Sequence, residues 1–173
     1  RLINHTFYQD KLVATIKKEN EITQLEPFAG RTIAKATVKD GAVRFTKGGT
    51  RQNTVSAEKV LSILDELKDN IPANVSVGVI TPYKGQANML RAMKAQRNYP
   101  TAFNNQVKIG TVHTFQGSEC DIIIFDIVDC AVTTQGRAAH VGKIFGGKDG
   151  EQLINVAVSR ARDRKSTRLN SSH

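Results

Sequence analysis

The chain has 173 residues, 39% of them hydrophobic, which is enough for one domain with a sizeable core and too little for two ordinary domains. Its formal net charge of +9 suggests a polyanionic partner, although Lys and Arg are spread along the chain and form no basic tail. The apolar stretch CDIIIFDIVDCAV is interrupted by Asp126 and Asp129, and the first residues lack the pattern of a secretory signal, so we expect neither a membrane span nor a signal peptide.

The two cysteines, Cys120 and Cys130, are too few for a disulfide framework and have no metal-ligand spacing with the histidines. A reducing, cytoplasmic setting and the absence of a metal site are the expectations that follow.

The first third of the chain gives a mixed pattern. Residues 3–12 resemble the end of a helix, and residues 13–53 form a mixed region with strand-like alternation at 32–38 and 42–45. Ser56 is the expected N-cap of a helix over 57–70, in which apolar residues recur at helical spacing. These residues are Val60, Leu61, Leu64 and Leu67.

Beyond residue 70 the pattern alternates between strands and helices. Buried strands are predicted at 75–80, 106–112 and 120–128, helices at 84–96 and 151–162, and a long glycine-rich surface loop at 131–150. Apolar strands that alternate with helices indicate a parallel sheet covered by helices on both faces. The predicted fold class is therefore α/β, doubly wound.

Three polar segments lie where such a sheet would bind a ligand. In open α/β sheets, ligands bind outside the carboxyl ends of the strands. TPYKGQ (81–86) and TVHTFQGSE (111–119) each follow a predicted strand or its end, and SRAR (159–162) ends the last helix. Each segment alone has an ordinary structural explanation, as a turn, a solvated carboxylate or a favourable helix end. Their joint occurrence in this order favours a functional role.

The chain resembles the second RecA-like domain of a superfamily 1 helicase, in the branch of the nonsense-mediated-decay helicase and its bacterial relatives. The segments that carry the resemblance are FYQDKL (7–12), VGVITPYKGQ (77–86), TVHTFQGSECDIIIFDIV (111–128) and LINVAVSRAR (153–162). The resemblance covers residues 1–162, with 13–52 matching only in outline. It implies a P-loop NTPase fold, truncated at both ends, and a parent enzyme that hydrolyses ATP with Mg²⁺ while it translocates along DNA or RNA from 5′ to 3′.

The resemblance also implies roles for particular residues. Arg160 would be the arginine finger, because a planar cationic fork stabilises charge on a transferring phosphoryl group. Arg162 is a second candidate, with an ion-paired helix-end arginine as the alternative. Glu119 would bind the ribose, and Gly117 would let the backbone approach closely. The implied contacts to a single strand of DNA or RNA are Thr81, Pro82, Thr111 and His113.

Two further features depart from the patterns they resemble. Many relatives carry Asn-x-x-Glu-Ala before the first helix, whereas this chain has NTVSA, with Ser56 in the acidic place. GKIFGGKD (142–149) has the glycine spacing of a P-loop but ends in Asp149, where Ser or Thr should bind Mg²⁺. We therefore expect a surface loop there. The catalytic P-loop, the Mg²⁺ carboxylates and most of the ATP site should belong to a first RecA-like domain of the parent chain, so that this piece alone hydrolyses no ATP.

Two alternatives stay open at this point. One is a non-catalytic nucleic-acid-binding module that kept the fold and lost the motor, and a P-loop upstream in the parent gene would argue against it. The weaker alternative is a stand-alone P-loop kinase that uses Lys148, which nucleotide binding dependent on Lys148 would support.

Residues 163–173 are expected to be a disordered tail of non-biological origin. They lack apolar periodicity, and the DNA that would encode DRKSTRLNSSH resembles a widely used sequencing adapter read in frame. Deleting 163–173 should leave the melting temperature of the chain nearly unchanged, because a segment without apolar periodicity is expected to add little to stability. A drop of several degrees in a thermal melt would contradict this interpretation.

Overall fold

The computed structural model describes residues 11–15 and 33–139 of the chain. In chain order its elements are β1 (Lys11–Thr15), β2 (Ile33–Thr37), β3 (Arg44–Phe45), β4 (Arg51–Gln52), α1 (Thr54–Leu67), β5 (Val77–Thr81), α2 (Lys84–Gln96), α3 (Thr101–Gln106), β6 (Val107–Thr111), the short 3₁₀ helix η2 (Val112–Phe115) and β7 (Ile122–Asp126).

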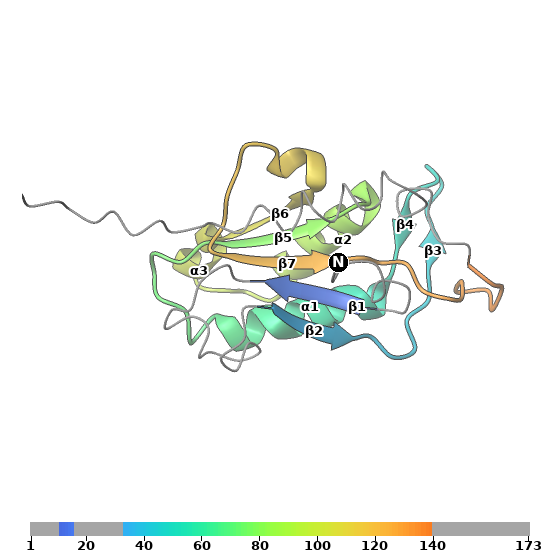
Figure 1. Cartoon of the computed structure of the whole chain (residues 1–173), viewed down its shortest axis with the longest axis horizontal. Coiled ribbons are helices and arrows are strands. Elements are labelled where there is room, and N and C mark those ends of the chain that lie inside the picture. The colour runs from blue at the N-terminus through green and yellow to red at the C-terminus, as the bar shows by residue number, and fades with distance from the viewer. Residues whose placement is uncertain (1–10, 16–32, 140–173) are drawn as a thin grey trace, which may run out of the picture.

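The main sheet has five strands in the order β2-β1-β7-β5-β6 (Figure 1). β5 pairs in parallel with both β6 and β7, which confirms the predicted α/β fold with its parallel sheet. β1 pairs antiparallel with β7 and with β2, so an antiparallel pair extends the parallel part. Sheets of this mixed kind are common among large α/β folds.

Two local predictions near the N-terminal part are wrong. Lys11 and Leu12, expected to close a helix, lie in β1, where they pair with Thr37 and Ala36 of β2. The N-cap of α1 is Asn53, whose side chain accepts a hydrogen bond from the backbone N–H of Ser56. α1 therefore starts three residues earlier than predicted, because the Asn53 side-chain oxygen caps the amide of Ser56, which lies inside the first turn of the helix.

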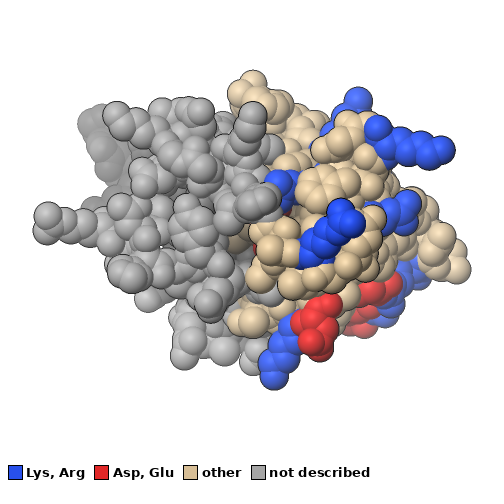
Figure 2. Space-filling model, turned by 90° about the vertical axis from the view of Figure 1, so that its right-hand side faces the viewer, with Lys and Arg blue, Asp and Glu red and all other residues tan. Residues whose placement is uncertain are grey.

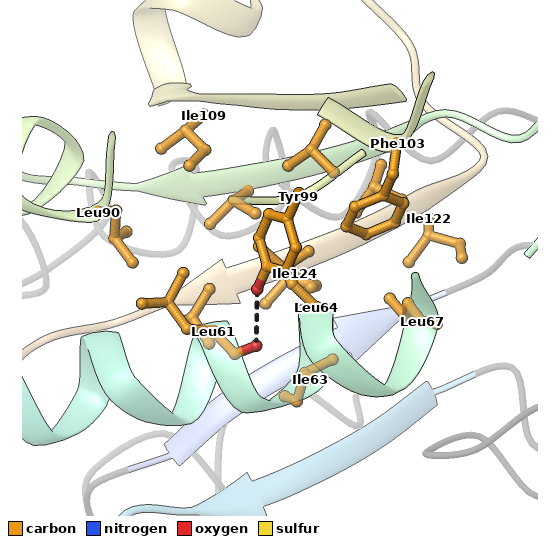
Figure 3. Close-up of a cluster of buried hydrophobic side chains, with 14 of the residues drawn as sticks. Leu61, Ile63, Leu64, Leu67, Leu90, Tyr99, Phe103, Ile109, Ile122 and Ile124 are labelled. Atoms are coloured by element: carbon orange, nitrogen blue, oxygen red, sulfur yellow. Dashed lines mark hydrogen bonds between the residues drawn. The ribbon is translucent and has the colours of Figure 1, made fainter. Parts of the chain in front are cut away.

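The core lies between the sheet and the helices α1, α2 and α3 (Figure 3). The apolar positions predicted on the first helix are confirmed, since Val60, Leu61, Leu64 and Leu67 are all fully buried. They pack with alternate residues of the parallel strands and with the edge-to-face ring pair Tyr99 and Phe103. α3, which sequence periodicity missed, presents Phe103 to this core although its sequence TAFNNQ has weak helix propensity.

A buried polar cluster ties the two long helices to the end of β7. Asp126, the last residue of β7, is completely buried and accepts hydrogen bonds from the Ser56 hydroxyl, from Gln86 Nε2 (2.7 Å) and from the Val128 amide (3.1 Å). Gln86 also accepts from the Asn53 amide (2.9 Å) and donates to the Asn53 carbonyl (3.0 Å). The starts of α1 and α2 are therefore held at a fixed distance from the carboxyl end of β7.

Burial raises the pKa of the Asp126 carboxyl above its ordinary value of 3.8, and the hydrogen bonds from Ser56, Gln86 and Val128 oppose this shift. A carboxyl with a raised folded-state pKa favours the folded state at low pH. That contribution is lost as the pH rises from the unfolded pKa through the folded one.

We predict that Asp126→Asn flattens this pH dependence. At low pH the variant should be less stable by about 1–3 kcal/mol, because its amide N–H would face the Gln86 donor. As the pH rises above about 4, where unfolded carboxyls ionise, the difference in the free energy of unfolding between the variant and the parent chain should become smaller. Urea unfolding between pH 4 and pH 8 measures this, with the exposed Asp69→Asn as the control for losing a carboxylate. A constant gap across that range would contradict the assignment.

Candidate nucleic-acid and nucleotide interface

The structure brings two of the predicted strand-contacting residues together. Thr81 ends β5 and Thr111 ends β6, and the two are register partners across the parallel pair. Pro82 follows Thr81 directly and is half-buried, whereas His113 is exposed on η2. All of them lie at the carboxyl end of the parallel strands, where open α/β sheets bind ligands.

The hydroxyl of Thr81 is unsatisfied among the residues that the structure describes. Thr81 is fully buried and its Oγ1 has no hydrogen-bond partner there, whereas the hydroxyls of Thr111 and Thr114 lie 3.1 Å apart. Buried polar atoms without a partner are uncommon in folded proteins. The end of β5 thus holds a donor and acceptor that the described residues do not use.

Phe115 anchors the segment that carries the predicted contacts. Its side chain is fully buried against β5 and β6 at positions where both strands have glycine. A Cβ on Gly78 would lie 2.9 Å from the Phe115 ring, and one on Gly110 would lie 3.2 Å from it. The glycines in VGVI and KIGT therefore leave room for Phe115, which sets the position of η2 relative to the sheet. A glycine in each of two adjacent apolar strands, on the same face of the sheet, is the sequence signal for such a ring.

A tight turn follows η2. Gln116 has φ −60° and ψ 124°, Gly117 has φ 77°, and the Ser118 amide donates to the Phe115 carbonyl at 3.0 Å. These angles define a type II turn, which needs glycine at its third position. No atom lies within 4 Å of a Cβ built on Gly117, so backbone conformation, not space, requires the glycine.

Glu119 lies apart from the paired threonines. It is exposed, and it precedes Asp121, whose carboxylate accepts hydrogen bonds from the Ser76 amide (2.9 Å) and hydroxyl (2.7 Å) at the start of β5. In Figure 1 the chain returns from η2 to the amino end of β7 across this segment. The structure therefore separates Glu119 from Thr81 and Thr111 along the length of the strands.

The remaining predicted site residues, Arg160 and Arg162, lie outside the described residues, as do Lys148 and the P-loop-like segment 142–149. Within the described ranges no group of His, Cys, Asp and Glu could hold a metal ion, and no helix is long and apolar enough to cross a membrane.

Cations also line a cavity at the edge of the sheet, away from the paired threonines. The cavity of about 290 Å³ lies between α2 and β6 and is lined in part by Arg91 and Lys94. Arg91 donates to the Ile109 carbonyl (2.8 Å), and Lys94 to the Asn104 carbonyl (3.1 Å). Burial lowers the pKa of Lys94. These cations are held by backbone carbonyls of the edge strand β6 and of α3, and none of the predicted site residues lines the cavity.

Tyr83, in the segment TPYKGQ, has a role that the sequence did not reveal. Its hydroxyl donates to Asp129 Oδ2 (2.8 Å), while Asp129 Oδ1 accepts from Arg51 Nη1 (2.6 Å). Burial and the neighbouring Asp129 raise the pKa of Tyr83 well above its ordinary range. Tyr83 thus joins the loop after β5 to β4 and to the segment after β7.

Comparison with known proteins places the chain among helicases. The family model described as "AAA domain" matches residues 1–166. Helicase sen1 of Schizosaccharomyces pombe is 37% identical over 126 residues, which cover 70% of this chain and 7% of that protein. An uncharacterized ATP-dependent helicase of Methanocaldococcus jannaschii, MJ0104, is 30% identical over 172 residues, covering 92% of this chain and 23% of that protein.

A third relative is the Regulator of nonsense transcripts 1 homolog of Drosophila melanogaster. It is 31% identical over 87 residues, covering 50% of this chain and 7% of that protein. The chain thus spans less than a quarter of the length of each of these relatives.

Proposed function

This chain belongs to the AAA domain family, as the second RecA-like motor domain of a superfamily 1 helicase in the branch of the nonsense-mediated-decay helicase. We propose that it supplies the arginine finger and part of the single-strand binding surface of an ATP-dependent DNA or RNA helicase. The pairing of Thr81 with Thr111 at the carboxyl ends of β5 and β6 is the observation that most supports the strand-binding part of this role.

On the strand side, the contacts we propose are made to the backbone. Thr111 and Pro82 are partly exposed and His113 is exposed, so a hydroxyl, a ring and an imidazole are accessible at the end of the sheet. The Thr81 hydroxyl is buried and has no partner among the described residues, so it could reach a phosphate only if the end of β5 moved. Such groups hold phosphates and sugars without reading bases, as a translocating motor requires.

On the nucleotide side, the proposed residues are Glu119 for the ribose, Gly117 for close backbone approach, Arg160 for the γ-phosphate and Arg162 beside it. The exposure of Glu119 is compatible with this role, and its separation from Thr111 fits a segment that contacts nucleotide at one end and strand at the other. Hydrolysis of ATP would supply the free energy of translocation. The first RecA-like domain of the parent chain would hold most of ATP and Mg²⁺, so this chain alone should be inactive.

The setting and direction follow from the same premise. We propose a cytoplasmic parent that moves 5′ to 3′ along its strand. A non-catalytic binding module with the same fold would bind the strand equally well, so the experiments below separate strand binding from ATP turnover.

We predict weak binding of single-stranded DNA or RNA, without sequence preference and with an affinity that falls as salt rises. The slope of log K against log salt should be about −0.7 for each phosphate contacted. Thr111→Val should weaken binding in an anisotropy titration. Thr101 is an exposed threonine at the start of α3, and the control substitution Thr101→Val should leave binding unchanged. Binding that ignores salt, or that needs one base sequence, would argue against this surface.

We predict that Arg160→Ala, in a reconstructed parent with both motor domains, lowers ATP turnover about a thousandfold or more. Arg160→Lys should restore turnover only in part, because an ammonium keeps the charge and loses the fork. Strand affinity without nucleotide should change much less. Strand-stimulated ATPase activity and strand affinity are measured together. Turnover by Arg160→Ala within a few-fold of the parent, with the fold intact, would instead favour the non-catalytic module.

A further inference from the structure

The β3–β4 hairpin presents an aromatic side chain to solvent. Phe45 is 50% exposed, and the other exposed large hydrophobic residues of the described part, Val55 and Val132, are aliphatic. Figure 1 places the hairpin beyond the carboxyl ends of the parallel strands. An exposed aliphatic residue is ordinary, but a phenylalanine ring carries a large apolar surface that folding usually buries.

The hairpin is held firmly in place although its strands are short. Strands of two residues do not form a stable hairpin by themselves. Thr50 Oγ1 accepts from the Gly85 amide (3.1 Å), and Gln52 Nε2 donates to the Gly85 carbonyl (3.0 Å). A Cβ on Gly85 would lie 2.5 Å from Thr50 Cγ2, so the glycine permits this close contact. The hairpin is thereby fixed to the TPYKGQ segment at the start of α2.

The ring of Phe45 rests on a fixed cation. The guanidinium carbon of Arg51 lies 5.2 Å from the centroid of the Phe45 ring and 5.7 Å from that of Tyr83. Asp129 holds the same guanidinium through an ion pair of 2.6 Å, and the Arg51 side chain is only 13% exposed. These contacts fix the orientation of the Phe45 ring while half of its surface remains accessible.

The surroundings of the ring are basic. Arg44 precedes Phe45 and is exposed, as is Lys47 at the tip of the hairpin. The sequence contains no Asp or Glu between Gly41 and Ala57. Figure 2 looks onto this end of the molecule, where Lys and Arg side chains are spread over the described surface and the acidic side chains gather at its lower edge. The exposed cations therefore attract a polyanion to this hairpin.

We propose that Phe45, with Arg44 and Lys47, forms a stacking platform for a base of single-stranded nucleic acid. The inference rests on the proposed strand-binding function and adds a contact that lies on the hairpin, outside the segments 81–86 and 111–119. The platform adjoins the first of these segments, because Gly85 and Tyr83 contact the hairpin directly. The platform thus lies next to the segment in which Pro82 is a proposed strand contact.

The physical properties of the platform suit this ligand. Every base has a π-face, so stacking on an aromatic ring tolerates any sequence, and flanking cations attract the backbone phosphates. A ring already fixed by Arg51 loses little conformational freedom when a base stacks on it. Exposed cations beside a rigid ring are thus the combination that a sequence-independent single-strand contact needs.

The first test is a titration of the chain with labelled oligo-dT and oligo-U. Phe45→Ala and Phe45→Leu should each weaken binding by about 5-fold to 100-fold, the range for loss of one base stack, without changing the salt slope. Lys47→Gln should make the slope of log K against log salt less steep by about 0.7. Val132→Ala, which shortens another exposed apolar side chain, is the matched control and should bind like the parent chain.

The second test uses the absence of tryptophan from the chain. Phe45→Trp introduces a single fluorophore at the platform, and its emission should be quenched when oligo-dT or oligo-U saturates the chain, with affinity kept or increased. Asn105→Trp places the fluorophore on the exposed side of α3, and its emission should stay nearly unchanged. Thermal melts of every variant confirm that the fold is retained.

The outcomes separate the two proposals. Salt-dependent binding of the parent chain with no effect of Phe45→Ala, or with no quenching in Phe45→Trp, would overturn the platform and leave the proposed function standing. If Phe45→Leu bound the oligonucleotides with the affinity of the parent chain, an apolar contact would suffice without base stacking. That result would also overturn the platform. No binding of either oligonucleotide by the parent chain would overturn both proposals.

Discussion

The buried carboxylate of Asp126 is the constraint on which the functional end of the molecule depends. A carboxyl taken out of water needs a partner for its lone pairs, since an unsatisfied one costs several kcal/mol. Here the donors come from α1, from α2 and from the segment after β7, namely Ser56, Gln86 and Val128. Displacing any of these elements would leave a buried polar group without its partner. The carboxyl end of the central strand and the starts of both helices therefore hold one geometry, and the paired threonines lie at that same end of the sheet.

The same buried cluster also positions the β3–β4 hairpin on the surface. Gln86 donates a hydrogen bond to the buried Asp126, while its neighbour Gly85 accepts one from Gln52 of the β3–β4 hairpin. The first turn of α2 therefore contacts both the buried cluster and the hairpin. At the adjoining strand, Phe115 packs over glycines and positions η2, and the turn at Gly117 redirects the chain toward Glu119. The segment 111–119 thus connects the carboxyl end of β6 with the amino end of β7 through a buried ring and a tight turn.

The basic composition divides into cations with structural partners and cations that remain exposed. Arg51 is paired with Asp129, Arg97 with Glu58 and Asp65, while Arg91 and Lys94 donate to backbone carbonyls near the sheet edge. These contacts use part of the positive charge to hold elements together. The exposed Arg44 and Lys47 lie at the end of the molecule where the strand is proposed to bind. Net charge alone could not make this division, because it depends on which side chains meet an acceptor in space.

The sequence by itself determined the α/β class, the apolar face of α1, the bounds of α2 and the existence of the three central strands to within two residues at their ends, because burial imposes a periodicity that can be counted along the chain. It also located the polar segments that follow β5 and β6. It did not identify Asn53 as the cap of α1. It also did not place Lys11 and Leu12 in a strand, or show that Phe115 needs the glycines of two strands. Ser56 and Asp126 are 70 positions apart, and Gln86 and Asp126 are 40 apart. Only the tertiary structure decided these partnerships, because a hydrogen bond or a packing contact depends on distance in space, which periodicity along the chain does not encode.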